Sequence, residues 1–212
     1  IMWRWQAGPG TAVYAMLRML VQLFAIGYVL IYLFETDNYW VIAGVLSIMI
    51  AVASWIAVRP LGASKRLSWP NSLIAIGLTS IVILAVVTQA VIGVEPWFSP
   101  RYVIPLGGMV VTGAMNAVSL AAERFQAETA RDEPVREACR SAFRTALIPI
   151  TNMLFAVGVV SLPGMMTGQI LSGVSPLIAA KYQIIVMAMF FGTSGIAAAI
   201  YLQLEMRRAG YS

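Results

Sequence analysis

The sequence predicts an all-α polytopic membrane protein, a helical bundle of six transmembrane helices with one amphipathic helix at the cytoplasmic face. Of its 212 residues, 60% are hydrophobic and 11% are charged, and the mean hydropathy is +0.82. Soluble domains have about 45–50% apolar and about 25% charged residues. Long apolar segments recur along the chain without the alternation of apolar and polar residues that barrel strands show. We therefore expect residues 1–212 to form a single domain in a bilayer.

A transmembrane helix needs about 20 mostly apolar residues to cross about 30 Å of hydrocarbon. Six segments meet this requirement: residues 12–34, 39–58, 72–93, 102–122, 146–163 and 182–204. Helices are expected because they satisfy their own backbone polar groups in lipid. The first segment is too long for a signal-peptide core, and Glu35 and Asp37 follow it where a small-residue cleavage site would lie. We expect it to be a retained helix.

Basic residues predict how these helices are oriented. Three connections carry most of them: Arg59, Lys65 and Arg66; Arg124, Arg131, Arg136, Arg140 and Arg144; Arg207 and Arg208. The alternate connections carry few: Glu35 with Asp37, Glu95 with Arg101, and Lys181. This is the positive-inside pattern of the plasma (inner) membrane, with both termini of the chain cytoplasmic. Topology thus explains the net charge of +5, and no basic patch interleaved with aromatic residues favours nucleic-acid binding.

One polar segment, the connector at residues 123–145, carries ten charged residues. Its first part is expected to extend the fourth helix, and Pro134 fits the first turn of a second, short helix because that position needs no backbone N–H. Asp132 and Glu133 complement the positive end of that helix. Basic and apolar side chains recur on different faces of it: Arg136, Arg140 and Arg144 on one, and Val135, Cys139, Ala142 and Phe143 on another.

The pattern alone leaves two interpretations of this amphipathic helix open. It is either a solvated connector whose arginines lie near anionic head groups, or a docking helix for a cytoplasmic partner. In the second case its apolar face would enter a groove and its charges would set the register.

Composition excludes several kinds of chemistry. The chain has no His and one Cys, which excludes Cys/His zinc sites, His-based triads and disulfide frameworks. No G-x-x-x-x-G-K-[ST] motif is present, so the chain has no P-loop to bind ATP. Gly192-Thr-Ser-Gly195 matches the pattern of rhomboid proteases, but Ser194 lacks an imidazole base and nothing orients a Ser175–Lys181 pair. We expect no enzymatic activity.

The segment between the last two spans is expected to break the helix at Pro163-Gly164. Irregular backbone near membrane depth must be buried in protein or line a wet cavity, so this segment is either a packed turn or part of a pathway. The candidate pathway residues are Arg18, Gln22, Asn116, Asn152, Met165, Met166, Lys181 and Gln183. Competing roles are gap filling for the methionines, hydrogen bonds between helices for the amides and snorkelling for the two cations. No metal ligand set is predicted.

Several runs of residues resemble the iron-export ABC-transporter permease family (FetB-like), which includes the plant aluminium-tolerance permeases. The runs are Ala146-Leu-Ile-Pro149, Val159-Val-Ser-Leu-Pro-Gly-Met-Met166 with Gly168, Ala180-Lys-Tyr-Gln-Ile184, and Gly107-Gly-Met109 through Asn116-Ala-Val118. The likeness is strongest over residues 104–204. In the first 100 residues it rests mainly on hydropathy and on Arg18, Gln22, Gly27 and Tyr28.

The resemblance implies a permease subunit that exports iron or a related metal. Two copies would pair with two copies of a separate cytoplasmic ATPase, which would hold ATP-Mg, and the connector would contain the coupling helix. The residues implied to contact the ATPase are Arg131, Glu133, Pro134, Arg136, Glu137 and Arg140. Family members usually have one further helix ahead of the first span found here. The alternatives are a membrane adaptor or passive channel without an ATPase, and an ABC permease for a non-metal substrate.

Overall fold

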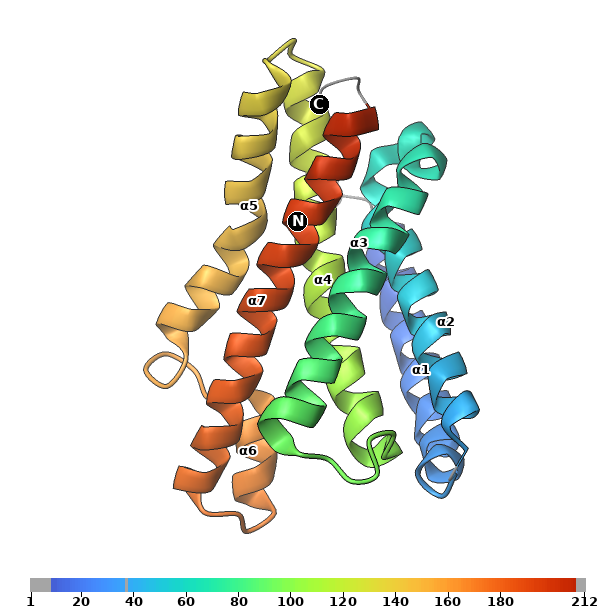
Figure 1. Ribbon diagram of the computed structural model, residues 1–212, viewed down its shortest axis with the longest axis vertical. Helices are drawn as coiled ribbons and strands as arrows, with labels where there is room; N and C mark the ends of the chain where they lie inside the picture. The colour runs from blue at the N-terminus through green and yellow to red at the C-terminus, as the bar shows by residue number, and fades with distance from the viewer. Residues whose placement is uncertain (1–8, 37, 209–212) are drawn as a thin grey trace.

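The computed structural model describes residues 9–36 and 38–208 as a bundle of helices (Figure 1). Asp37, expected in the first loop, lies outside these residues. The seven α-helices of the described residues are α1 (Pro9–Phe34), α2 (Tyr39–Ala57), α3 (Lys65–Ala85), α4 (Pro100–Thr129), α5 (Val135–Ala156), α6 (Gly164–Leu171) and α7 (Pro176–Arg208). A 3-10 turn, η1 (Arg59–Ser64), precedes α3, and π-helical η2 (Val86–Ile92) continues it.

Five of these helical segments are long and apolar enough to cross a membrane: Val13–Phe34, Tyr39–Ala57, Arg59–Ile92, Pro100–Thr129 and Pro176–Arg208. They contain the first four predicted spans and the last one almost completely. The prediction of an all-α, polytopic membrane protein is therefore confirmed. The count of six uninterrupted spans is not, because the fifth predicted span is not one helix.

The fifth predicted span, residues 146–163, and the separate amphipathic helix before it need correction. The amphipathic helix and the first part of that span, up to Ala156, form one continuous helix, α5, which begins just after Pro134. Its arginines occupy the first half, so that only residues 145–156 are free of charge. At 1.5 Å per residue this apolar part is about 18 Å long, short of the about 30 Å of hydrocarbon. Figure 1 shows α5 reaching only part of the way along the bundle, with α6 in the remaining length.

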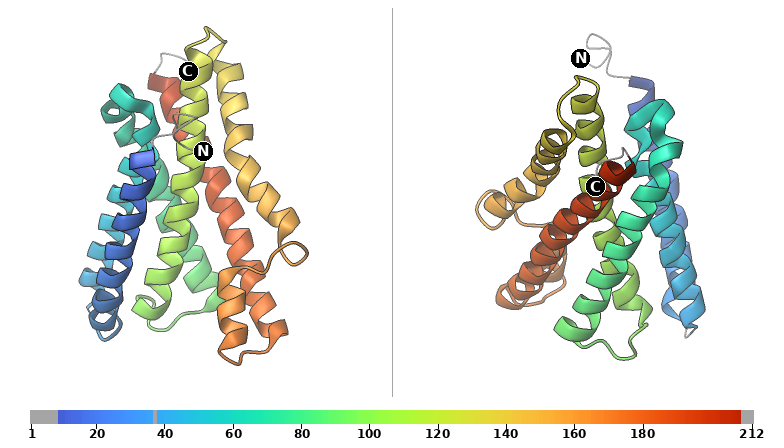
Figure 2. Two further views of the ribbon diagram at one scale, coloured as in Figure 1. Left: turned by 180° about the vertical axis from the view of Figure 1, so that it is seen from behind. Right: turned by 45° about the horizontal axis from the view of Figure 1, so that its top comes forward.

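Helices α4 and α7 lie at the centre, with α5 on one side and α2 and α1 on the other (Figure 1; Figure 2). Three segments lie together at one end, which we call the basic end: η1, the turn at residues 130–134 and the end of α7. The loops at 93–99 and 172–175 lie at the opposite end.

Small side chains bring α4, α5 and α7 close together. On the α5 face that meets the core, three successive positions four residues apart are alanines, Ala138, Ala142 and Ala146, and Ile150 continues the buried row. They join a core cluster with alanines of α4 and α7 and with Tyr201. Most side chains of α1, in contrast, are exposed and apolar, as expected of a helix that faces lipid.

Candidate functional site

The chain segment between α5 and α6 is irregular, and we call residues 157–163 the break. Gly158 has a φ of +83°, in the left-handed region that glycine adopts without a Cβ penalty. Its N–H donates to the Ser161 carbonyl at 3.0 Å, while the N–H groups of Val159, Val160 and Ser161 all donate to the Ala156 carbonyl. These bonds form a tight turn that directs the chain away from the axis of α5.

Helix α6 restarts directly after Pro163, whose fixed φ suits a residue that precedes a helix. The predicted helix break at Pro163-Gly164 is therefore present, but the helix that ends is already finished at Ala156, seven residues earlier than the proline. The glycine at position 158 explains the earlier end, since its N–H donates forward to Ser161 and no longer to the Leu154 carbonyl, its acceptor in a continuing helix.

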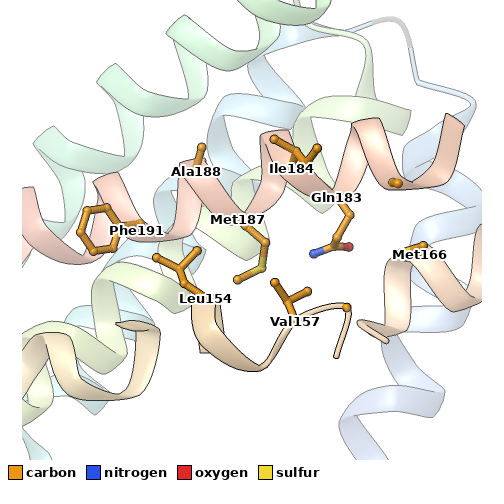
Figure 3. A pocket seen from close by; sticks show the side chains of 10 residues that line it. Leu154, Val157, Met166, Gln183, Ile184, Met187, Ala188 and Phe191 are labelled. Carbon is orange, nitrogen blue, oxygen red and sulfur yellow. The ribbon is translucent and has the colours of Figure 1, made fainter. Parts of the chain in front are cut away.

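A groove of about 480 Å³ opens between the end of α5, the break, α6 and α7 (Figure 3). This volume falls in the range of small-molecule pockets, about 300–1,000 Å³. Its lining is almost entirely apolar and consists of Leu154, Val157, Gly158, Met166, Ala180, Gln183, Ile184, Met187, Ala188 and Phe191.

Gln183 is the one strongly polar side chain in this lining. The residue is only 6% exposed, and its Oε1 accepts no hydrogen bond from any residue that the structure describes. Figure 3 shows its amide directed into the groove, towards the side on which Met166 and Val157 lie, with Met187 one helical turn along α7. A buried amide oxygen without a donor is costly, by about 1–3 kcal/mol. The groove therefore presents an acceptor that a ligand, water or protein group could satisfy.

A second cavity, of about 450 Å³, lies on the other side of α6, against α4 and α7. Met109 and Met165 line it together with Gln169, whose Oε1 also has no partner among the described residues. Arg101 is the charged residue in its lining. Helix α6 thus separates two cavities, with Met165 facing one and Met166 the other.

The structure brings only some of the predicted pathway residues together. Met166 and Gln183 share the groove, and Met165 lines the second cavity. The other five line neither cavity and have exposed side chains: Arg18, Gln22, Asn116, Asn152 and Lys181. Sequence reasoning missed Met187 and Gln169. Met187 lies four residues after Gln183, a spacing that places both on one face of a helix.

The six residues expected to contact an ATPase lie together at the basic end. They occupy the turn between α4 and α5 and the first two turns of α5, and all are exposed: Arg131, Glu133, Pro134, Arg136, Glu137 and Arg140. Pro134 directly precedes α5 rather than lying in its first turn. We call this unit, residues 123–145, the hairpin tip.

The apolar face of the hairpin tip is not free for a partner, which corrects one part of the docking interpretation. Ala142 is buried, and Val135, Cys139 and Phe143 pack on the core cluster that α4, α5 and α7 share. Burial raises the pKa of the Cys139 thiol. The faces of the hairpin tip that stay exposed are the arginine face and the turn, because the chain covers the apolar face itself.

Buried Glu128 fixes the geometry of the hairpin tip. It forms an ion pair with Arg124 and accepts a hydrogen bond from Ser141 Oγ at 3.0 Å. Arg124 Nε donates to the same hydroxyl at 3.1 Å. Charge-assisted hydrogen bonds of this kind are about twice as strong as neutral ones.

No three His, Cys, Asp or Glu side chains gather into a possible metal site anywhere in residues 9–36 and 38–208. The groups in the cavities that could meet a cation are thioethers and amide oxygens. Thioethers prefer soft metals such as Cu(I), whereas amide oxygens suit harder ones. Ser194, in the rhomboid-like pattern, is buried in α7 with its Oγ beside Gly113 of α4, which fits a packing role.

Comparison with known proteins shows relatives over nearly the whole chain. A membrane protein of Synechocystis is 31% identical over 96% of this chain and 86% of its own length. The "probable iron export permease protein FetB" of Escherichia coli is 31% identical over 90% of this chain and 78% of its own length. The Arabidopsis thaliana protein "ALUMINUM SENSITIVE 3" is 32% identical over 89% and 73%, respectively.

No solved structure matches the chain. The model of an uncharacterised protein family, UPF0014, matches residues 3–209. The resemblance that the sequence motifs indicated is thereby confirmed, because relatives that carry the iron-export and aluminium-sensitivity names are among the matches. The chain is a multi-pass membrane protein that belongs to the UPF0014 family.

Proposed function

We propose that this chain is the permease subunit of an ABC exporter for iron or a related metal, driven by a separate cytoplasmic ATPase. The observation that carries the proposal is the relationship, over 90% of the chain, to a protein named as a probable iron export permease. In this assembly two permease chains pair with two ATPase chains. ATP-Mg is held by the ATPase, since the permease has no P-loop.

The basic end faces the cytoplasm in this proposal. Arginines and lysines concentrate there, as the positive-inside rule requires of cytoplasmic connections. Helix α1 begins and α7 ends towards that end, so the start of α1 and the end of α7 are cytoplasmic in this proposal. Helix α5, the break and α6 together complete a sixth crossing, which is interrupted rather than continuous.

The hairpin tip is the element that receives force from the ATPase. Its arginines and its turn are exposed, while Glu128 and the alanine face of α5 attach it rigidly to α4 and α7. A displacement of the hairpin tip therefore moves α5 as a whole. The far end of α5 leads directly into the break, which lies beside the groove. This continuity would connect nucleotide-driven motion at one end to a cavity within the membrane.

The groove is the proposed pathway surface, with Gln183, Met166 and Met187 as its distinctive side chains. Because amide oxygen and thioether sulfur are weak ligands, they suit a cargo that must be released again. A mostly apolar lining equally fits a chelated metal or a non-metal compound, so the substrate assignment rests on the relative's name and has to be tested separately from the transporter class.

Metal tolerance is the direct test. Cells that lack the protein are expected to accumulate iron and to grow poorly in excess iron, and co-expression of the chain with its ATPase should reverse both defects. An ATPase variant unable to hydrolyse ATP serves as the control. Unchanged iron content with the active pair present would remove the metal assignment. Activity without any ATPase would instead favour a passive channel, and a chain that binds partners without transport would be an adaptor.

A further inference from the structure

In the orientation proposed above, the break lies at a depth where backbone polar groups have no water. If Arg144, the last arginine of α5, lies at the cytoplasmic membrane surface, the 12 residues after it carry the chain about 18 Å into about 30 Å of hydrocarbon. Lipid-exposed irregular backbone does not occur at such a depth, because each unpaired group costs several kcal/mol.

The break has such unpaired groups on an exposed surface. The carbonyl oxygens of Val157, Gly158, Val159 and Val160 accept no hydrogen bond from any residue that the structure describes. Val159 and Val160 are 89% and 79% exposed. The contrast with α1 is informative, because α1 is equally exposed and apolar but is a regular helix whose backbone is satisfied internally. Lipid can therefore cover α1 but not the break.

The apolar surface around the break is large enough for a stable contact. Seven large side chains on neighbouring segments are each more than half exposed: Phe155, Val159, Val160, Leu162, Leu171, Leu177 and Ile184. At about 25 cal/mol per Å², a side chain whose burial contributes about 1.5–3 kcal/mol corresponds to on the order of 100 Å². Because these side chains are 58–89% exposed, the patch offers on the order of 500 Å². Two such patches would bury about 1,000 Å², the lower limit of a specific interface.

We infer that a second copy of this chain covers the break, and that the dimer interface consists of the end of α5, the break, α6 and the start of α7. The inference rests on the pairing of two permease chains proposed above and names the surface that pairs. A two-fold contact is self-complementary. Two exposed donors lie beside the break, the Asn152 amide and the Ser161 hydroxyl, and are free to bond carbonyls of a second copy. The two grooves then form one enclosed space in which trapped water can hydrate the remaining groups.

Cysteine crosslinking in native membranes tests this interface. In a Cys139→Ala background, which has no other cysteine, Val160→Cys and Leu162→Cys place thiols in the break. Val21→Cys, on α1, is the matched control, since Val21 is 70% exposed on a regular helix. With bismaleimide linkers of two lengths, crosslinked dimer should predominate for the break variants and remain at background for Val21→Cys. Photobleaching steps of fluorescent single molecules in bilayers should show two copies of the unmodified protein.

Three results would overturn the inference. One is a dimer in which neither break variant crosslinks, which would place the interface elsewhere and leave the permease proposal intact. Another is equal crosslinking of Val160→Cys and Val21→Cys, which would indicate random collision. The third is a monomer with a tightly bound lipid at the break, detected by native mass spectrometry. Metal tolerance is measured independently of all three, so a failed interface is distinguishable from a failed transport function.

Discussion

Ser141 donates a hydrogen bond from Oγ to Glu128 Oε1 over 3.0 Å, and this contact joins the end of α4 to the second turn of α5. Arg124 contacts both residues: it forms an ion pair with Glu128, and its Nε donates to the Ser141 hydroxyl at 3.1 Å. The carboxylate is buried although it lies near the turn. A solvated loop would not need this anchoring, whereas a lever that transmits force would.

Replacing Glu128 should loosen the hairpin tip. Glu128→Ala removes the acceptor for Ser141 and the partner of Arg124, and we expect a loss of about 1–2 kcal/mol, because charged hydrogen bonds contribute about 1.5–3 kcal/mol and Arg124 is partly solvated. The measurement is the thermal unfolding midpoint of the protein in detergent. Glu123→Ala, at an exposed position of the same helix, should leave the midpoint unchanged. Equal effects of the two substitutions would show that the buried contact is energetically unimportant.

A side chain at position 158 should destabilise the turn. Gly158→Ala places a Cβ on a residue with a φ of +83°, which costs on the order of 1–2 kcal/mol. We expect a lower unfolding midpoint and reduced transport. The control is Gly44→Ala in α2, where an added Cβ meets no atom within 4 Å and the backbone is helical. If Gly158→Ala behaves like Gly44→Ala, the left-handed turn is not required.

The membrane-spanning helices were largely predictable from the sequence, whereas the extent of α5 was not. The ends of α1 and α2 agree with the predicted spans to within a few residues, because hydropathy and the flanking polar residues mark both boundaries. Helix α5 was divided wrongly, because its arginine face and its alanine face were read as a surface helix followed by a separate span. Alanine occurs on both buried and exposed helix faces, so the alanines of α5 did not show in the sequence that this face packs against α4 and α7.

The cavity residues were harder to predict for a related reason. In a helix that is apolar all round, periodicity does not say which face meets which neighbour. Asn116 and Gln183 look alike in the sequence, but the first is exposed on α4 and the second is buried beside the groove. What distinguishes them is which neighbouring elements pack on each helix face, and the helix sequence alone does not give that packing.

The unpaired Gln183 amide separates a transport role from a packing role. Gln183→Leu keeps the volume but removes a buried acceptor without a partner, so stability should be unchanged or rise by about 1 kcal/mol. Metal export should fall if the amide contacts the cargo. Gln203→Leu, at an exposed position of the same helix, should alter neither property. Export that persists at the normal rate in Gln183→Leu would exclude this amide from the pathway, whatever the stability shows.

Charge reversal on the exposed face of α5 tests the link to the ATPase. Arg136→Glu and Arg140→Glu change side chains that point away from the core, so the permease should fold normally, with an unchanged unfolding midpoint. We expect the pair of substitutions to abolish co-purification with the ATPase and to lower metal-stimulated ATP hydrolysis to the basal rate, because like charges would replace the complementary contact. Arg207→Glu, also at the basic end but on α7, is the matched control and should retain both activities. Normal co-purification of Arg136→Glu/Arg140→Glu would exclude the arginine face as the docking surface. Labelling of introduced cysteines at these positions from outside the cell would exclude a cytoplasmic partner altogether.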